Sequence, residues 1–292
     1  MLFAQITLNG LLLGGLYACM AMSFSLIWGV MNIINLAHGS MMLLGAYVTY
    51  SLHVRTGIDP ILTMPVSAAV LFVLGYSLQK FVFNRAAMRS IYMTLIMTFG
   101  LDMMLINLNL ALFTADMRSI TTWYSGLALD IGGLRIAYTR LLAFVIALLM
   151  AFALYYFLKV SRTGRAIRAT AQDPRLARVV GIDAARIYGV TFGLGAAMAG
   201  ATGSLITVVY VFSPVIGDSF TLKSFVVVVL GGLGNVPGTI LAGVFLGIVE
   251  NLVSGFIDAG YRDAISFCLL ILILVLRPNG FLGKSSYAVS RA

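Results

Sequence analysis

The sequence predicts an all-α protein, a polytopic membrane helix bundle with about eight transmembrane helices, some of them broken or re-entrant. Hydrophobic residues make up 61% of the 292 residues and charged residues only 10%, whereas soluble domains carry about 25% charged residues. No charged residue precedes Arg55. Because no polar stretch is long enough for a soluble domain, residues 1–292 are expected to form a single transmembrane domain.

Nine apolar segments follow one another along the chain, and a helix needs about 20 residues to span the hydrocarbon core. Segments near that length lie at residues 6–28, 33–52, 61–83, 91–113, 138–158, 187–212 and 239–257. Two more are marginal, because 222–234 is short and interrupted by glycine and 264–276 has only 13 residues. The chain is therefore expected to cross the membrane eight or nine times, depending on whether 222–234 passes through or turns back.

The distribution of charge predicts the orientation. One set of connecting segments carries 13 basic and two acidic residues, and the opposite set carries six of each. Short loops rich in Lys and Arg stay in the cytoplasm, so residues 80–89, residues 159–186 and the C-terminus are expected inside. Nine crossings would place the N-terminus outside; eight would place it inside or require a re-entrant segment. This topology also accounts for the net charge of +9, so we expect no nucleic-acid partner.

Residues 159–186 form the one strongly charged stretch, with seven of the 19 basic residues against two aspartates. A short helix is expected from Arg165, with Arg165 and Arg168 on one face. Asp173 and the proline after it should start a second helix, which Gly181 and Asp183 would close. Such a pair of helices would make a rigid docking element for a soluble partner; a basic loop bound to anionic membrane lipid is the alternative.

Signatures of catalysis are missing from the sequence. It contains no GxSxG or HExxH motif and no paired carboxylates within an apolar run. The C-terminal PNGFLGKS resembles a phosphate-binding loop, but Pro278 replaces its first glycine and no strand precedes it. We therefore expect no catalytic residues, metal site or cofactor in this chain. If ATP drives transport, partner subunits would hold the ATP and Mg²⁺.

Two sets of polar residues lie at membrane depth, where polar groups need partners or a cavity. Asn32, Asn35 and His38 recur every three residues and would form one stripe on a helix, either lining a pathway or broken helix or fixing a kink through hydrogen bonds. Asp102 and Glu250 each lie in an apolar run without an evident basic partner and should face the bundle interior. They are open to a gating role, to structural hydrogen bonding, or to ion coupling in a stand-alone transporter or channel.

Glycines punctuate the apolar segments. Gly231 and Gly232 interrupt a β-branched run, a pattern that marks either a transport pathway or a packing hinge. GLLLG at residues 10–14 and GVFLG at 243–247 predict close helix packing within the bundle. No internal repeat is evident, although glycine-interrupted segments around 29–39 and 231–238 faintly suggest related halves.

Four stretches resemble the membrane permeases of bacterial ABC importers for branched-chain amino acids (the LivH-like family). They are NLAHG at 35–39, SRTGRAIRATAQDPRLARVVGID at 161–183, VLGGLGNVPGTILAGVFLGIVE at 229–250 and RPNGFLGK from residue 277. The resemblance covers nearly the whole chain. It implies a multi-pass subunit of the bacterial inner membrane, paired with a second related permease, two cytoplasmic ATPases and a periplasmic binding protein.

The resemblance also implies roles for residues. The loop at residues 159–186 would be the element that enters a groove on the ATPase, with contacts at Gly164, Arg165, Arg168, Ala169, Asp173, Gly181 and Ile182. Our candidates for the translocation pathway are Asn32, Asn35, His38, Asp102, Gly231, Gly232 and Glu250. Relatives import urea, short amides or aromatic acids, so the resemblance leaves the cargo open among branched-chain amino acids and similar small amphipathic molecules.

Overall fold

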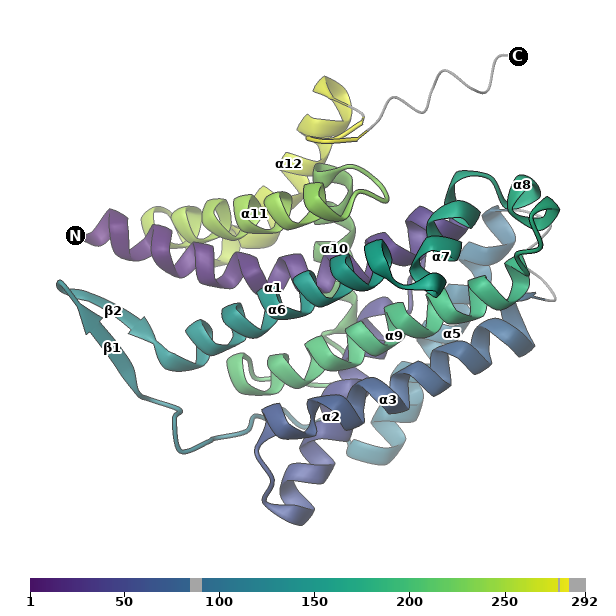
Figure 1. Ribbon diagram of the computed structural model, residues 1–292. Helices are drawn as coiled ribbons and strands as arrows, with labels where there is room; N and C mark the ends of the chain where they lie inside the picture. The colour runs from purple at the N-terminus through teal and green to yellow at the C-terminus, as the bar shows by residue number, and fades with distance from the viewer. Residues whose placement is uncertain (85–90, 278, 284–292) are drawn as a thin grey trace.

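In the computed structural model the described residues, 1–84, 91–277 and 279–283, form a helical bundle with one small hairpin (Figure 1). The long helices are α1 (Leu2–Met31), α3 (Pro60–Leu78), α5 (Ile91–Phe113), α6 (Tyr138–Val160), α9 (Ala184–Val209) and α11 (Val236–Phe256). The other helices are α2 (His38–Thr56), α7 (Arg162–Gln172), α8 (Pro174–Val179), α10 (Gly217–Gly231) and α12 (Arg262–Leu276). A π-helical turn, η1 (Gln79–Phe83), follows α3, and a 3-10 turn, η2 (Ala259–Tyr261), precedes α12.

The all-α prediction is confirmed except for one antiparallel hairpin of β1 (Ala128–Ile131) and β2 (Leu134–Ala137). The hairpin marks one end of the bundle and α7 with α8 mark the other (Figure 1). The chain begins at the hairpin end. There Gln5 Nε2 donates to the carbonyl oxygen of Arg135 at 2.6 Å, and the Arg135 N–H donates to Gln5 Oε1 at 2.8 Å. At the same end the Tyr124 hydroxyl donates to the Asp59 carboxylate. Burial, with that carboxylate adding to it, raises the pKa of Tyr124 to about 12.

The described chain runs between these two ends nine times. Within the described residues seven helices are long and apolar enough to cross a membrane, so this is a multi-pass membrane protein. The passes through α2 and α10 complete the nine, and each consists of a non-helical link followed by a helix of 19 or 15 residues, respectively. The N-terminus and α7–α8 therefore lie at opposite ends, as the nine-crossing alternative requires. Arg85, Arg89, Lys284 and Arg291, four of the charges expected inside, lie outside the described residues.

The link at residues 32–37 contradicts the predicted helical stripe. Asn32 ends α1 with a left-handed backbone (φ 53°) and is exposed, whereas Asn35 is buried in the link and His38 begins α2. Since only His38 is helical, the three residues share no helix face, and the alternative of a broken helix is correct. His38 Nε2 lies 3.0 Å from the carbonyl oxygen of Met20, which is 11 residues, or about 16 Å, before the end of α1. The link therefore returns to the middle of the bundle before α2 starts.

A second link repeats this geometry in the opposite direction. After α9 reaches the hairpin end, residues 210–216 turn back and α10 begins beside the start of α2. A Cβ built on Gly217 would lie 3.1 Å from the backbone nitrogen of Ser40, and the Gly39 N–H donates to Thr221 Oγ1 at 2.8 Å. From this meeting point α2 runs to the hairpin end and α10 to the α7–α8 end.

The two halves thus form an inverted repeat, with α1–α2–α3–α5 matching α9–α10–α11–α12. The packing follows the same relation, because α1 packs along α11 as α9 packs along α3. Repeats of this kind place functional sites where the halves meet. The sequence indicated related halves only faintly, and its correspondence was wrong: the counterpart of 29–39 is the link before α10, not 231–238.

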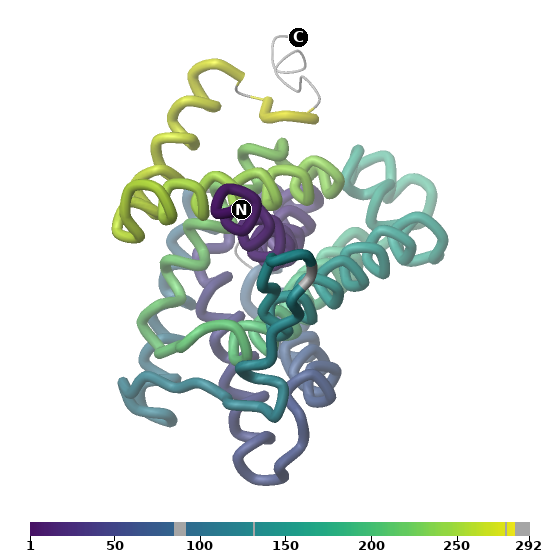
Figure 2. The backbone as a smooth tube through the Cα atoms, turned by 90° about the vertical axis from the view of Figure 1, so that its left-hand side faces the viewer, coloured from purple at the N-terminus to yellow at the C-terminus, as the bar shows by residue number. Residues whose placement is uncertain are grey.

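Small residues allow α1 and α11 to touch along their backbones, as the GLLLG and GVFLG patterns predicted. A Cβ on Gly247 would lie 2.6 Å from the carbonyl oxygen of Gly10, and one on Gly14 would lie 2.8 Å from that of Gly243. Viewed from the hairpin end, α1 lies near the middle of the bundle (Figure 2). The close approach of α1 and α11 therefore fixes the centre of the fold.

Replacing Gly247 by leucine should destabilise the protein by about 1–3 kcal/mol, because the side chain would push two backbones apart. The temperature at which the detergent-solubilised chain loses its monodisperse elution peak measures this. Gly100→Leu is the matched control, since Gly100 lies on an exposed face of α5 with nothing within 4 Å of a Cβ, and leucine is the better helix former. Equal loss in both variants would contradict the packing argument.

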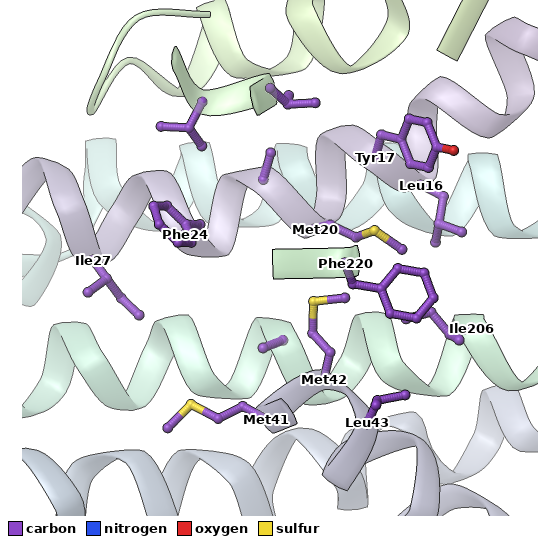
Figure 3. Packing of buried hydrophobic residues seen from close by; sticks show 14 of the residues in the cluster. Leu16, Tyr17, Met20, Phe24, Ile27, Met41, Met42, Leu43, Ile206 and Phe220 are labelled. Carbon is purple, nitrogen blue, oxygen red and sulfur yellow. The ribbon is translucent and has the colours of Figure 1, made fainter. Parts of the chain in front are cut away.

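The buried core joins α1, α2, α9 and α10. Met42 of α2 points toward Met20 of α1 and Phe220 of α10, with Ile206 of α9 beside them (Figure 3). All four side chains are buried. This packing holds the start of α2 and the start of α10 in place, and the candidate polar sites are built around those two starts.

Candidate functional site

The α7–α8 element forms a compact projection at its end of the bundle. Ser161 caps α7 by accepting from the Gly164 N–H, and Asp173 caps α8 by accepting from two N–H groups. The helix at α7 starts earlier than predicted, at Arg162. Gly181 ends α8 with a left-handed backbone (φ 83°), but Asp183 caps α9 instead of closing α8. Two short helices with fixed ends are thus present as predicted.

The residues implied for ATPase contact gather in this projection, and several also hold it against the bundle. Arg165 donates to the carbonyl of Val160 at 2.8 Å and Arg168 to that of Lys159 at 3.2 Å. Both guanidinium groups therefore cap the end of α6, on one face of α7 as predicted. Gly164 is buried, because a Cβ there would lie 2.6 Å from the Cα of Leu158.

Ile167 anchors the projection, since its buried side chain joins α7 to a cluster with Leu26 and Ile187. Of the remaining implied contact residues, Ala169 and Ile182 are half-buried. Movement of α7 would therefore be transmitted directly to α1, α6 and α9.

The sequence interpretation missed the apolar surface of α8. Leu176, Val179 and Val180 are 65%, 83% and 74% exposed, although they lie among the basic residues of this stretch. They occupy positions i, i+3 and i+4, a spacing that indicates one face of a helix and could have been recognised in the sequence. Exposed apolar patches of this kind occur on surfaces that contact a protein partner or the membrane.

The second polar region surrounds Glu250, which is fully buried. Its carboxylate accepts from Tyr17 at 2.6 Å and from Ser266 at 2.5 Å. Lys223 Nζ lies 3.1 Å from both carboxylate oxygens and 3.2 Å from Asp263. Four helices, α1, α10, α11 and α12, therefore meet at this one carboxylate.

The network around Glu250 corrects one prediction from sequence. Glu250 faces the interior as expected, but it does have a basic partner, which lies on another helix. Lys223 stands seven positions into α10, within the apolar segment that looked marginal. A lysine placed there was the signal that sequence reasoning passed over, because only the fold brings it to Glu250.

The third polar region lies where α2 and α10 begin. Asp102 on α5 is buried and accepts from Ser40 at 2.5 Å, and the Asp218 carboxyl of α10 lies beside it. His38 is fully buried, with Nε2 also 3.2 Å from the Ser23 hydroxyl. Asp218 itself is exposed. A carboxylate exposed at the middle of an apolar bundle is costly in lipid, so this face requires a protein or water covering.

The candidate pathway residues therefore do not form one cluster. Asn35, His38 and Asp102 lie near the start of α2, and Glu250 lies in the network described above. Gly231 and Gly232 lie at the end of α10, where Gly232 has φ 99°. The predicted break in the helix there is confirmed.

The end of α10 is closed by the C-terminal segment. The Phe281 N–H donates to the carbonyl of Leu230 at 2.7 Å, and Asn235 Nδ2 donates to the carbonyl of Leu282 at 2.6 Å. The turn that follows α10, residues 233–237, faces Lys159 and Arg168 across a cleft of about 480 Å³. The end of α10 is thus a neighbour of α7.

Comparison with known proteins identifies the family. Residues 6–274 match the family model described as branched-chain amino acid transport system / permease component. The chain is 32% identical to the high-affinity branched-chain amino acid transport system permease protein BraD of Pseudomonas aeruginosa, over 97% of this chain and 96% of that protein. It is also 32% identical to LivH of Escherichia coli K12, with the same coverage.

More distant matches extend the comparison. The permease protein LivM of the same Escherichia coli strain is 24% identical over 91% of this chain and 68% of its own length. Among solved structures, PsaBC from Streptococcus pneumoniae in complex with Fab aligns with a TM-score of 0.49 and 12% identity, over 93% of this chain and 92% of that one. On the strength of the family model and of the 32% identities across nearly the whole chain, this protein belongs to the branched-chain amino acid transport system permease family.

Proposed function

We propose that this chain is the permease subunit of an ATP-driven importer for branched-chain or similar small amphipathic amino acids in the bacterial inner membrane. It would work with a second related permease, two cytoplasmic ATPases and a periplasmic binding protein. The likeness to BraD and LivH over almost the full length carries this proposal. It favours the importer over a stand-alone ion-coupled transporter using Asp102 or Glu250. The match to LivM as well as LivH in one organism supports a pair of related permeases.

The ATPase would dock on the projection formed by α7 and α8. The exposed apolar side chains of α8 supply the contact, and the exposed arginines around them favour an acidic rim on the partner. The positive charge of this end supports a cytoplasmic position for it, where ATP is found. Force applied to α8 would reach α6 through the two arginine caps of α7, and α1 and α9 through the packing of Ile167.

The double substitution Arg165→Glu and Arg168→Glu should uncouple ATP hydrolysis from uptake, because it removes both caps on the end of α6 and puts negative charge beside its carbonyls. We expect about a tenfold fall in amino acid moved per ATP, equivalent to about 1.4 kcal/mol of lost coupling. Simultaneous assays of ATP hydrolysis and uptake in proteoliposomes measure this ratio. Arg135→Glu at the hairpin end is the control, and an unchanged ratio in the double variant would rule out coupling through the arginine caps on α6.

The translocation pathway would run along the face formed by α5, α10 and α12. On this face α10 exposes Asp218 and Ser219, while Lys223 and Asp263 form an ion pair beside them. Because lipid tolerates such groups poorly, the second permease would cover the face and enclose the pathway. Passage along charged but already partnered groups requires only weak contacts with the cargo.

Purification from the native host tests the proposal directly. The tagged chain, solubilised gently, should bring down two ATPase subunits and a second permease, and the reconstituted complex should take up leucine, isoleucine or valine only with ATP and the loaded binding protein. A chain that is recovered alone, and that drives uptake with an ion gradient, would overturn the importer proposal.

A further inference from the structure

The ion pair between Lys223 and Asp263 is open on one side. Lys223 Nζ is held from the interior by Glu250, which is 0% exposed, and from the outside by Asp263, whose side chain is 62% exposed. The Lys223 side chain itself is 15% exposed. The buried carboxylate therefore keeps the ammonium group in position, while the outer carboxylate is free to rotate away.

The groove around this pair has a polar wall and an apolar wall, which match the charged groups and the aliphatic side chain of an apolar amino acid. Its polar wall contains Ser219, Lys223 and Asp263, and its apolar wall contains Leu222, Val226 and Phe267. The enclosed volume is about 40 Å³, which accommodates one small group, such as a carboxylate, and leaves the rest of a ligand on the exposed face. Asp263 lies in the first turn of α12, so the groove opens toward the hairpin end, opposite α7–α8.

The charges of this cluster discriminate between classes of ligand. Lys223, Glu250 and Asp263 carry one positive and two negative charges when ionised, and each is satisfied through Lys223. A carboxylate that displaced Asp263 would leave that aspartate without its partner and add a further negative charge. An amine would bind Asp263 only by competing with Lys223. A zwitterion adds no net charge and supplies a partner for both groups, since its carboxylate pairs with Lys223 and its ammonium with Asp263.

We propose that Lys223 and Asp263 form a transient binding site for zwitterionic amino acids, with the aliphatic side chain of the ligand against the exposed side chains of Leu222 and Phe267. The ligand must first break the existing ion pair between Lys223 and Asp263. This cost offsets part of the gain from the two new ion pairs, so binding is weak. Weak binding suits a pathway, because a group that binds tightly would not release its cargo. This site rests on the proposed function, since it gives the importer a selective contact inside the membrane domain.

Protection of an introduced cysteine tests the site. In the complete transporter, in nanodiscs without ATP, Ser219→Cys in a Cys268→Ser background places a thiol in the groove; Cys268 is exposed and Cys19 is buried. L-leucine at about twice its dissociation constant should slow reaction with a small charged thiosulfonate about threefold, because protection scales with one plus ligand concentration over Kd. Isocaproate, which lacks the ammonium, and isoamylamine, which lacks the carboxylate, should give no protection.

Two variants complete the experiment. Asp263→Asn added to Ser219→Cys should abolish protection by leucine, whereas Ala128→Cys in the exposed hairpin should react at the same rate with and without leucine. Equal protection by all three ligands, or protection that survives Asp263→Asn, would overturn the proposal. A second cysteine variant in the groove, Phe267→Cys, tests access. If the reagent modifies neither Ser219→Cys nor Phe267→Cys, a ligand could not reach the groove and the proposal would also fail. ATP-driven uptake by the unmodified complex is measured separately, so loss of uptake would count against the importer and loss of protection against this site.

Discussion

Replacing Lys223 by methionine should destabilise the protein by about 3–5 kcal/mol, the usual result of removing one partner from a buried ion pair. Glu250 would remain fully buried with only the hydroxyl groups of Tyr17 and Ser266 to satisfy its charge. The midpoint of unfolding in an SDS titration, followed by circular dichroism of the solubilised chain, measures the loss. The ammonium also joins α10 to α11 and α12, so short α10 should loosen first.

A second substitution distinguishes this mechanism from simple loss of packing. Glu250→Gln in the Lys223→Met background removes the unpaired charge and should recover most of the stability, because the amide oxygen accepts from one of the two hydroxyl groups and the amide NH2 donates to the other. Arg135→Met is the matched control, since it breaks the exposed pair with Asp130 at the hairpin end and should leave the midpoint unchanged. If the double variant is as unstable as Lys223→Met, the charge argument is wrong.

Introducing charge into the apolar face of α8 should abolish transport. Val179→Asp with Val180→Asp places two carboxylates where we expect a hydrophobic contact with the ATPase, and truncating such anchors commonly costs 2 kcal/mol or more each. Affinity for the ATPase should therefore fall about 1000-fold, and ATP-driven uptake should fall with it. Both side chains are highly exposed, so the fold of the permease itself should persist.

Quantitative pull-down of the ATPase by the tagged permease measures this affinity, and an unchanged elution profile of the free permease confirms its fold. Leu129→Asp provides the control, because Leu129 is an exposed apolar residue of the hairpin at the opposite end of the molecule. Recovery of the ATPase at the normal level by the α8 variant would place the docking surface elsewhere.

Much of the fold could be predicted because each membrane-spanning helix requires a long run of apolar residues, which is easily recognised in the sequence. The long apolar runs and the glycine break after Gly231 correspond to observed elements. The prediction failed at residues 32–37, where a period of three in Asn32, Asn35 and His38 imitated a helix. Helical period is a local signal, whereas the link is held by a long-range contact between His38 and Met20.

The polar sites show the same difference between what local sequence reveals and what long-range contacts determine. Burial of Asp102 and Glu250 could be predicted because charge at membrane depth must face inward. Their partners could not, because Lys223 lies 27 positions from Glu250 and Ser40 lies 62 positions from Asp102. The inverted repeat escaped detection for a related reason: two antiparallel copies of a fold need share only helix lengths and small residues at their contacts, and the sequence retains little else in common.

The closure of α10 by the C-terminal segment has a consequence for biogenesis. Phe281 emerges from the ribosome 50 residues after Gly231, so the last carbonyl groups of α10 have no protein partner while α11 and α12 are being inserted. Completion of this helix is therefore one of the last events in assembly of the nascent chain. Until then the insertion machinery or water must satisfy those carbonyls, and a ribosome stalled before residue 280 would hold α10 in that unfinished state.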